Sequence, residues 1–278
     1  MSGELGGGLA VKAGVFSRNP GFISTPVLNQ YVHAALNDTL NFNLPDLPIN
    51  PYVAPGLQLG WTPCRQGRYG AFWLVPEIAL ASLFGVNPNQ VPSISSLHIL
   101  QWTLSQLPGS EALAAPIQRQ RQGQQLAIAC QLPPPQLQLG GRYVANPSPG
   151  DSIGDTYGAV NLASGLPLGL DHRFWLGFHS SLSGSINPVP LSLAGGWLSQ
   201  GLLPGRPLDV LAIGFVRSSF NSQLNPGLNP EAVLELNYSF NLNANHPLQP
   251  VLQWVLNPGG TGQLNDILAA GLQLQLQF

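Results

Sequence analysis

Five charged side chains, one tryptophan and one histidine stand where they could contact a polar molecule. They are Lys12, Arg18, Arg142, Arg173, Trp175, His179 and Glu235. All lie in or beside segments in which apolar residues occupy every second position. Guanidinium and amide groups can replace water around hydroxyl groups, and an indole ring can stack on the face of a sugar ring. The set is therefore suited to contact with neutral, hydroxyl-rich molecules.

Each of these side chains also has a structural interpretation. Arg142 and Arg173 could pair with acidic residues and stiffen a wall, the candidates being Asp151, Asp155 and Asp171. His179 could be a hydrogen-bonded wall residue, and Arg206 lies in a turn between two prolines. Three tryptophans suit a membrane interface or a lipid-facing surface better than a ligand platform: Trp61, Trp197 and Trp254.

The elements that must position these residues are strands with one apolar and one polar face. In the segment 232–242 the even positions are apolar, whereas the odd positions include Glu235, Asn237, Ser239 and Asn241. Side chains on a strand alternate between two faces, so this period of two predicts strands. The same pattern predicts strands at 9–16, 57–62, from about 68, 125–132, 136–145, 155–163, 172–179, 191–200, 208–216, 248–256 and 267–278. In 172–179, Phe174, Leu176 and Phe178 are expected on the outward face.

Two long segments lack this pattern. The segment 17–54 is predicted to be a long loop that contains a short helix around 27–36 and then a proline-rich passage, and such a loop could fold into a lumen and narrow it. In 77–123, four leucines at helical spacing, Leu97, Leu100, Leu104 and Leu107, predict a short amphipathic helix in an external loop. The triplet 133–135 is three prolines, which predicts a turn between 125–132 and 136–145.

The composition favours a membrane barrel over a soluble domain. Only 8% of the residues are charged, 44% are hydrophobic, and no apolar run is long enough for a membrane helix. About a quarter of the residues of an average soluble protein are charged, whereas the outer surface of a barrel meets lipid. The net charge of −2 gives no reason to expect nucleic acid. Together with the alternation, this predicts an all-β, antiparallel up-and-down transmembrane β-barrel of about twelve recognisable strands.

Motifs for catalysis or metal binding are not found. The stretch 259–262 is glycine-rich but leads into a predicted strand, so it cannot place a phosphate at a helix N-terminus. The five histidines are scattered, and we expect no enzyme activity, cofactor or metal. Cys64 and Cys130 could form one disulfide, but Cys130 is in register with apolar residues and is more simply a lipid-facing side chain. Residues 1–4 contain no export signal, so either a signal was removed with upstream sequence or the start is misplaced.

The end of the chain resembles the OprB-type carbohydrate-selective porins. The resemblance is carried by 235–238 (Glu-Leu-Asn-Tyr), 248–254, 257–262 (Asn-Pro-Gly-Gly-Thr-Gly), Gly271 and the terminal Phe278, and by the turn at 201–210. The layout of 9–62 is similar too, and the match is loose at 77–121. The resemblance implies a porin of the bacterial outer membrane, which contacts lipid and admits carbohydrates or other small polar solutes by passive diffusion, with the cyanobacterial branch of the family as one candidate. It leaves open whether the protein forms a homotrimer.

The family barrel is larger than the strands counted here. About four upstream strands are missing relative to it, so residues 1–278 are expected to form a single porin domain that is N-terminally incomplete, or a narrower closed barrel. Two alternatives to a sugar porin remain. One is a general ion-permeable or structural outer-membrane protein, linked to the cell wall through a missing N-terminal module, and the other is a soluble β-sandwich. The sandwich requires the leucine-bearing faces to meet in a dry interior.

Overall fold

The structure, a computed structural model, describes most of the chain. The described residues are 2–6, 8–17, 26–37, 53–62, 67–69, 72–84, 96–105, 117–121, 124–128, 132–133, 135–145, 153–164, 166, 171–181, 187–241 and 247–274. Cys64, Cys130 and Leu107 lie outside these ranges, and so does the predicted lining residue Arg18.

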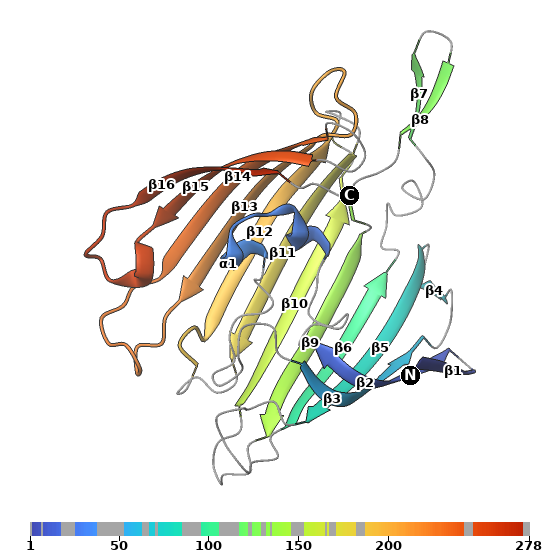
Figure 1. Cartoon of the computed structure of the whole chain (residues 1–278), viewed down its shortest axis with the longest axis vertical. Helices are drawn as coiled ribbons and strands as arrows, with labels where there is room; N and C mark the ends of the chain where they lie inside the picture. Colours follow the sequence, from blue (N-terminus) through green and yellow to red (C-terminus); the bar gives the residue numbers. More distant parts are fainter. Residues whose placement is uncertain are drawn as a thin grey trace.

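Fourteen strands form one large sheet (Figure 1). They are β1 (Ser2–Gly6), β2 (Leu9–Ser17), β3 (Val53–Trp61), β4 (Gly67–Tyr69), β5 (Phe72–Phe84), β6 (Ser96–Ser105), β9 (Gln136–Ala145), β10 (Ile153–Ala163), β11 (Asp171–Ser181), β12 (Leu191–Gln200), β13 (Val210–Ser219), β14 (Glu231–Asn241), β15 (Pro247–Leu256) and β16 (Ile267–Leu274). The neighbours pair antiparallel and follow one another in chain order, except that the short β4 pairs with β5 beside the main path. The predicted all-β, antiparallel up-and-down class is confirmed.

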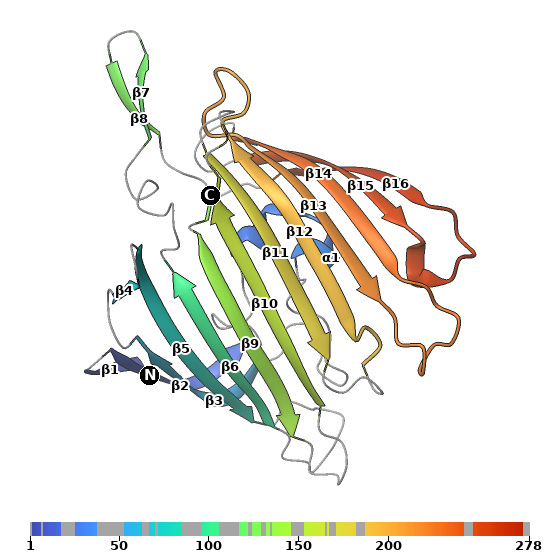
Figure 2. The ribbon, with the colours of Figure 1, turned by 180° about the vertical axis from the view of Figure 1, so that it is seen from behind.

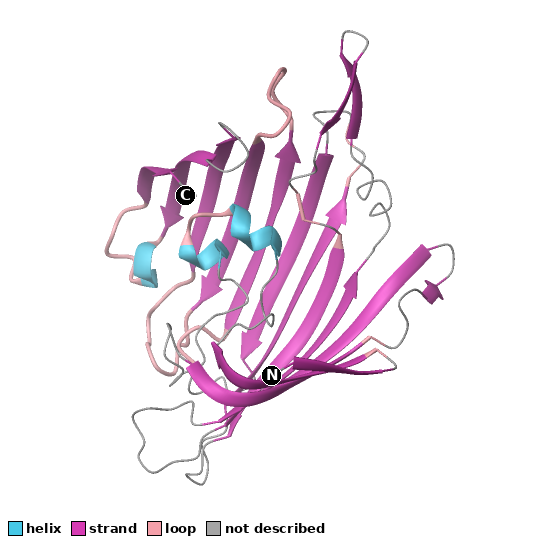
Figure 3. Ribbon diagram, turned by 45° about the vertical axis from the view of Figure 1, so that its right-hand side comes forward, coloured by secondary structure: helices cyan, strands magenta, loops and turns pink. Residues whose placement is uncertain are grey.

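The sheet is curved, and two short helices lie on its concave side (Figures 1 and 3). They are η1 (Pro26–Gln30) and α1 (Ala34–Asn37), in front of β11 to β13. The helix predicted around 27–36 is therefore present as two short pieces. A third one, η3 (Pro258–Gly260), lies in the turn between β15 and β16. None of the helices in the described part of the chain has the length and apolar character needed to span a membrane.

The two faces of the sheet have the reverse of the polarity found in a soluble protein. On β11, Leu176 is 67% exposed on the convex face, whereas Arg173 on the opposite face is 0% exposed. On β14, Leu234 and Leu236 are exposed and Glu235 between them is fully buried. Apolar side chains on the outside are stable when lipid covers them. The alternation thus indicates a membrane-facing convex surface, and the leucines do not meet in a dry interior as a sandwich would require.

The sequence-based interpretation of 77–123 as an external loop with a helix was wrong. Its first residues belong to β5, and 96–105 form β6, which pairs with β5 on one side and β9 on the other. The helical spacing was misleading because Ile99 is apolar yet buried on the concave face, so apolar residues occur on both faces of β6. The missed strands β1, β5 and β6 account for much of the difference between the expected twelve and the strands observed.

The two strands predicted at 125–132 and 136–145 are present as β8 (Gln124–Ile128) and β9, but they pair with different strands. β8 pairs with β7 (Ile117–Arg121) in a separate two-stranded hairpin, which extends away from the main sheet (Figure 2). β9 pairs instead with β6, far back in the sequence. Prolines cannot join a central ladder and so separate two strands, but they do not determine which strands become neighbours.

Candidate functional site

A row of paired residues crosses the concave face from β11 to β15. Trp175 pairs with Gly196, Gly196 with Gly214, Gly214 with Glu235, and Glu235 with Gln253. Directly paired residues of antiparallel strands lie on the same face. The row therefore presents an indole ring and a carboxylate with a gap of two glycines between them.

Tyr31, which follows η1, fills this gap. A Cβ atom at Gly214 would lie 2.3 Å from Cε1 of Tyr31, and one at Gly196 would lie 2.3 Å from its hydroxyl oxygen. The Tyr31 hydroxyl accepts a hydrogen bond from Nε1 of Trp175 (2.8 Å) and donates one to the carbonyl oxygen of Ile213 (2.9 Å). Burial raises the pKa of Tyr31 above its usual value of 10, the Trp175 hydrogen bond opposes this, and the negative charge of Glu235 adds to it. The hydroxyl thus stays protonated at neutral pH and can donate.

The Glu235 carboxylate holds the next two residues of the same segment. Its Oε1 accepts from the backbone N–H of Val32 (2.8 Å), and its Oε2 accepts from that of His33 (2.7 Å). Side-chain amides supply two more donors, from Asn237 to Oε1 (2.7 Å) and from Gln253 to Oε2 (3.0 Å). Four hydrogen bonds to one buried carboxylate offset the loss of its hydration.

Apolar contacts complete the attachment of residues 26–37, which we call the inner segment. Val27, Leu28 and Leu36 of the inner segment are buried in one hydrophobic cluster with small side chains of β12 to β14, namely Ala194, Ala212, Val216 and Val233. The carbonyl oxygen of Gln30 also accepts from the amides of Asn237 (3.0 Å) and Gln249 (3.1 Å). The inner segment thus covers apolar side chains of β12 to β14 on the concave face.

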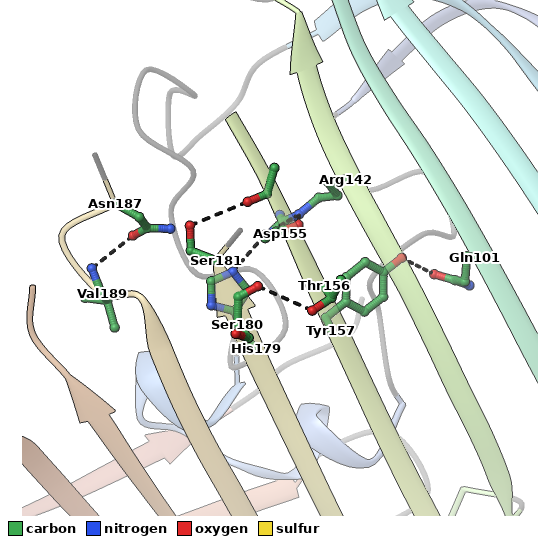
Figure 4. A network of polar contacts seen from close by, with 11 residues as sticks. Gln101, Arg142, Asp155, Thr156, Tyr157, His179, Ser180, Ser181, Asn187 and Val189 are labelled. Atoms are coloured by element: carbon green, nitrogen blue, oxygen red, sulfur yellow. Dashed lines mark hydrogen bonds and ion pairs between the residues drawn. The ribbon is translucent and has the colours of Figure 1, made fainter. Parts of the chain in front are cut away.

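A second network of polar side chains on the concave face joins β9, β10 and β11 (Figure 4). Asp155 accepts hydrogen bonds from the guanidinium group of Arg142, whose Nε lies 2.9 Å from each carboxylate oxygen. Nε2 of His179 lies 2.7 Å from Oδ2 of Asp155. Two residues further along β10, the Tyr157 hydroxyl donates to Oε1 of Gln101 on β6 (3.0 Å). These contacts link four strands from β6 to β11 across the wall.

The structure places the predicted lining residues in three environments. Arg142 pairs with Asp155, while Arg173 pairs with Asp171 and donates to the carbonyl oxygen of Pro133 (2.9 Å). These two arginines lie with Trp175, His179 and Glu235 on the concave face, and each of the five is at most 3% exposed. Lys12 on β2 is exposed, and Arg18 lies outside the described residues. Contact of any of them with a solute stays a prediction.

Sequence reasoning missed Tyr31, Gly196 and Gly214. Each glycine lies inside an apolar strand, at a position that faces the concave side. A glycine inside a strand often indicates that another group approaches the backbone closely. Nothing in the sequence indicates that this group is Tyr31, from a segment far away in the chain. Within the described residues, no group of three or more His, Cys, Asp or Glu side chains could hold a metal ion.

Comparison with known proteins gives a consistent result. The family model described as "Carbohydrate-selective porin, OprB family" matches residues 1–278. The high-pH structure of Pseudomonas putida OprB is similar with a TM-score of 0.71 at 16% identity, covering 100% of this chain and 71% of that one. The low-pH structure of the same protein has a TM-score of 0.54 at 16% identity and covers 98% and 62%. No curated protein sequence matches. At this identity the solved structures show a shared fold, and the match along the whole sequence shows that the chain belongs to the OprB family of carbohydrate-selective porins of the bacterial outer membrane.

Proposed function

We propose that this protein lets small neutral sugars diffuse passively across the outer membrane, along the polar concave face of its sheet, with residues 1–278 acting as one β-barrel domain. The observation that carries the proposal is the reversed polarity of the sheet, with leucines exposed outside and charges and amides inside. A lumen of this kind offers hydrogen-bonding partners to hydroxyl groups, and lipid covers the outside.

The buried and the accessible polar residues have different parts in this proposal. Arg142, Arg173 and His179 shape the wall through their pairs. Direct solute contact falls to accessible side chains of the concave face, for example Lys12 and Gln273, both of which are exposed. Gln273 pairs with Gln249, whose amide donates to the inner segment, and this places Gln273 on the same face. Accessible amides and an ammonium group bind hydroxyls weakly, which allows the fast release that conduction needs.

Family membership favours a channel over an enzyme, because the matching family consists of porins. A homotrimer is the assembly that we propose for it, and native mass spectrometry in detergent would measure the number of copies.

Liposome swelling tests the proposed function. Purified protein is reconstituted in liposomes, which are diluted into isosmotic solutions of a monosaccharide or a tetrasaccharide. We expect fast swelling with the monosaccharide and slower swelling with the tetrasaccharide, together with ion conductance in planar bilayers. Protein-containing liposomes that swell no faster than empty ones, and that show no conductance, would refute the proposal.

A further inference from the structure

We propose that Glu235 is a positioning residue that holds the inner segment against the wall and thereby sets the width of the lumen. This inference rests on the proposed function. It assigns to Glu235 no contact with the solute, although a carboxylate on the polar face of a porin would be an obvious candidate for one.

The Glu235 carboxylate is buried, and both of its oxygens are hydrogen-bonded within the protein. The side chain is 0% exposed, and both oxygens accept from backbone N–H groups of the inner segment as well as from wall amides. A solute hydroxyl would have to displace one of these donors. Glu235 is therefore occupied by the protein itself as long as the inner segment is in place.

The hydrogen bonds to the inner segment require a carboxylate at position 235. The N–H groups of Val32 and His33 point at different oxygens of the same carboxylate, so both terminal atoms must be acceptors. Glutamine has the same shape but only one acceptor oxygen, and its NH₂ group would face an N–H group. A charge-assisted hydrogen bond contributes roughly 1.5–3 kcal/mol, which corresponds to a change of about ten- to a hundredfold in the ratio of attached to detached segment.

The glycine gap provides an independent way to detach the same segment. The three atoms nearest to a Cβ atom added at Gly214 all belong to the Tyr31 ring, at 2.3 to 2.9 Å. Alanine at this position must therefore displace Tyr31, with no clash against the strand itself among these nearest contacts. At Gly177, on the concave face of β11, an added Cβ would lie no closer than 3.5 Å to any atom, which is ordinary van der Waals contact. Gly177→Ala is thus a matched control.

The experiment compares four variants with the unmodified protein in planar bilayers and in the swelling assay. The two anchor variants weaken the attachment of the inner segment in different ways. Glu235→Gln removes an acceptor for its backbone N–H groups, and Gly214→Ala displaces Tyr31. Gly177→Ala controls for a methyl group added to the wall. Glu231→Gln controls for the lost charge, since the Glu231 carboxylate accepts from the backbone N–H of Gly259 in the turn between β15 and β16.

Both anchor variants should show a higher single-channel conductance and faster swelling with the tetrasaccharide, whereas both controls should match the unmodified protein. An anchor that mattered only for stability would lower the unfolding temperature and leave the conductance and the size limit unchanged, and this result would overturn the inference. Equal behaviour of anchor and control variants would also overturn it. If the unmodified protein conducts no sugar, the proposed function fails instead, and a shift in ion conductance confined to the anchor variants would still support the anchor.

Discussion

Replacing Asp155 by asparagine should destabilise the folded protein strongly. Asp155 is buried, and it accepts from Arg142, whose side chain is 1% exposed, and contacts His179 at 2.7 Å. Asparagine leaves the Arg142 charge in the wall without a counter-charge. Breaking a buried ion pair in this way costs about 3–5 kcal/mol, much more than the ~1 kcal/mol at most for an exposed pair.

Urea unfolding in lipid vesicles, followed by tryptophan fluorescence, measures this loss. The double variant Arg142→Met with Asp155→Leu removes both charges, and we expect it to be more stable than Asp155→Asn alone, because an apolar pair of similar size carries no uncompensated charge. A loss below ~1 kcal/mol for the single variant would refute the reasoning. So would a double variant that is less stable than the single one.

Three further predictions concern packing, the lipid-facing surface and pH. Gly158→Ala should lower the free energy of unfolding by about 1–3 kcal/mol, since the added Cβ would lie 2.6 Å from the Phe178 ring. Gly14→Ala is the control, because an added Cβ there has no atom within 4 Å and should change the free energy of unfolding little. Equal losses in the two variants would contradict the prediction. Leu176→Arg should cost about 2–4 kcal/mol in vesicles, because it places a charge on the exposed convex face, and the loss should shrink at positions nearer the strand ends. Burial raises the pKa of Tyr31, so the attached inner segment keeps its stability below the usual pKa of about 10 and loses it as the pH rises further. Conductance should therefore rise in strongly alkaline buffer, and a Tyr31→Phe variant that shows the same rise would exclude Tyr31 as its source.

The strands with clean alternation were predictable from local sequence. For β9 and β12 the expected bounds 136–145 and 191–200 agree with the structure, and on β14 Leu234 and Leu236 lie on the face opposite Glu235, as the alternation predicts. A strand between lipid and a polar interior must alternate, because each face meets a different environment. The pattern failed on β6, where Ile99 adds an apolar residue to the concave face.

In the strands with clean alternation, the amino-acid sequence alone determined which side chains face lipid and which face inward, since that depends only on the period of two along the strand. The tertiary structure decided the partners: that Glu235 and Trp175 hold the inner segment, that Arg142 is paired with Asp155, and that β9 lies beside β6. Val32 and Glu235 are 203 positions apart in the chain. Contacts across such a separation depend on how the curved sheet brings its concave face around the inner segment, and no local pattern of residues carries that information.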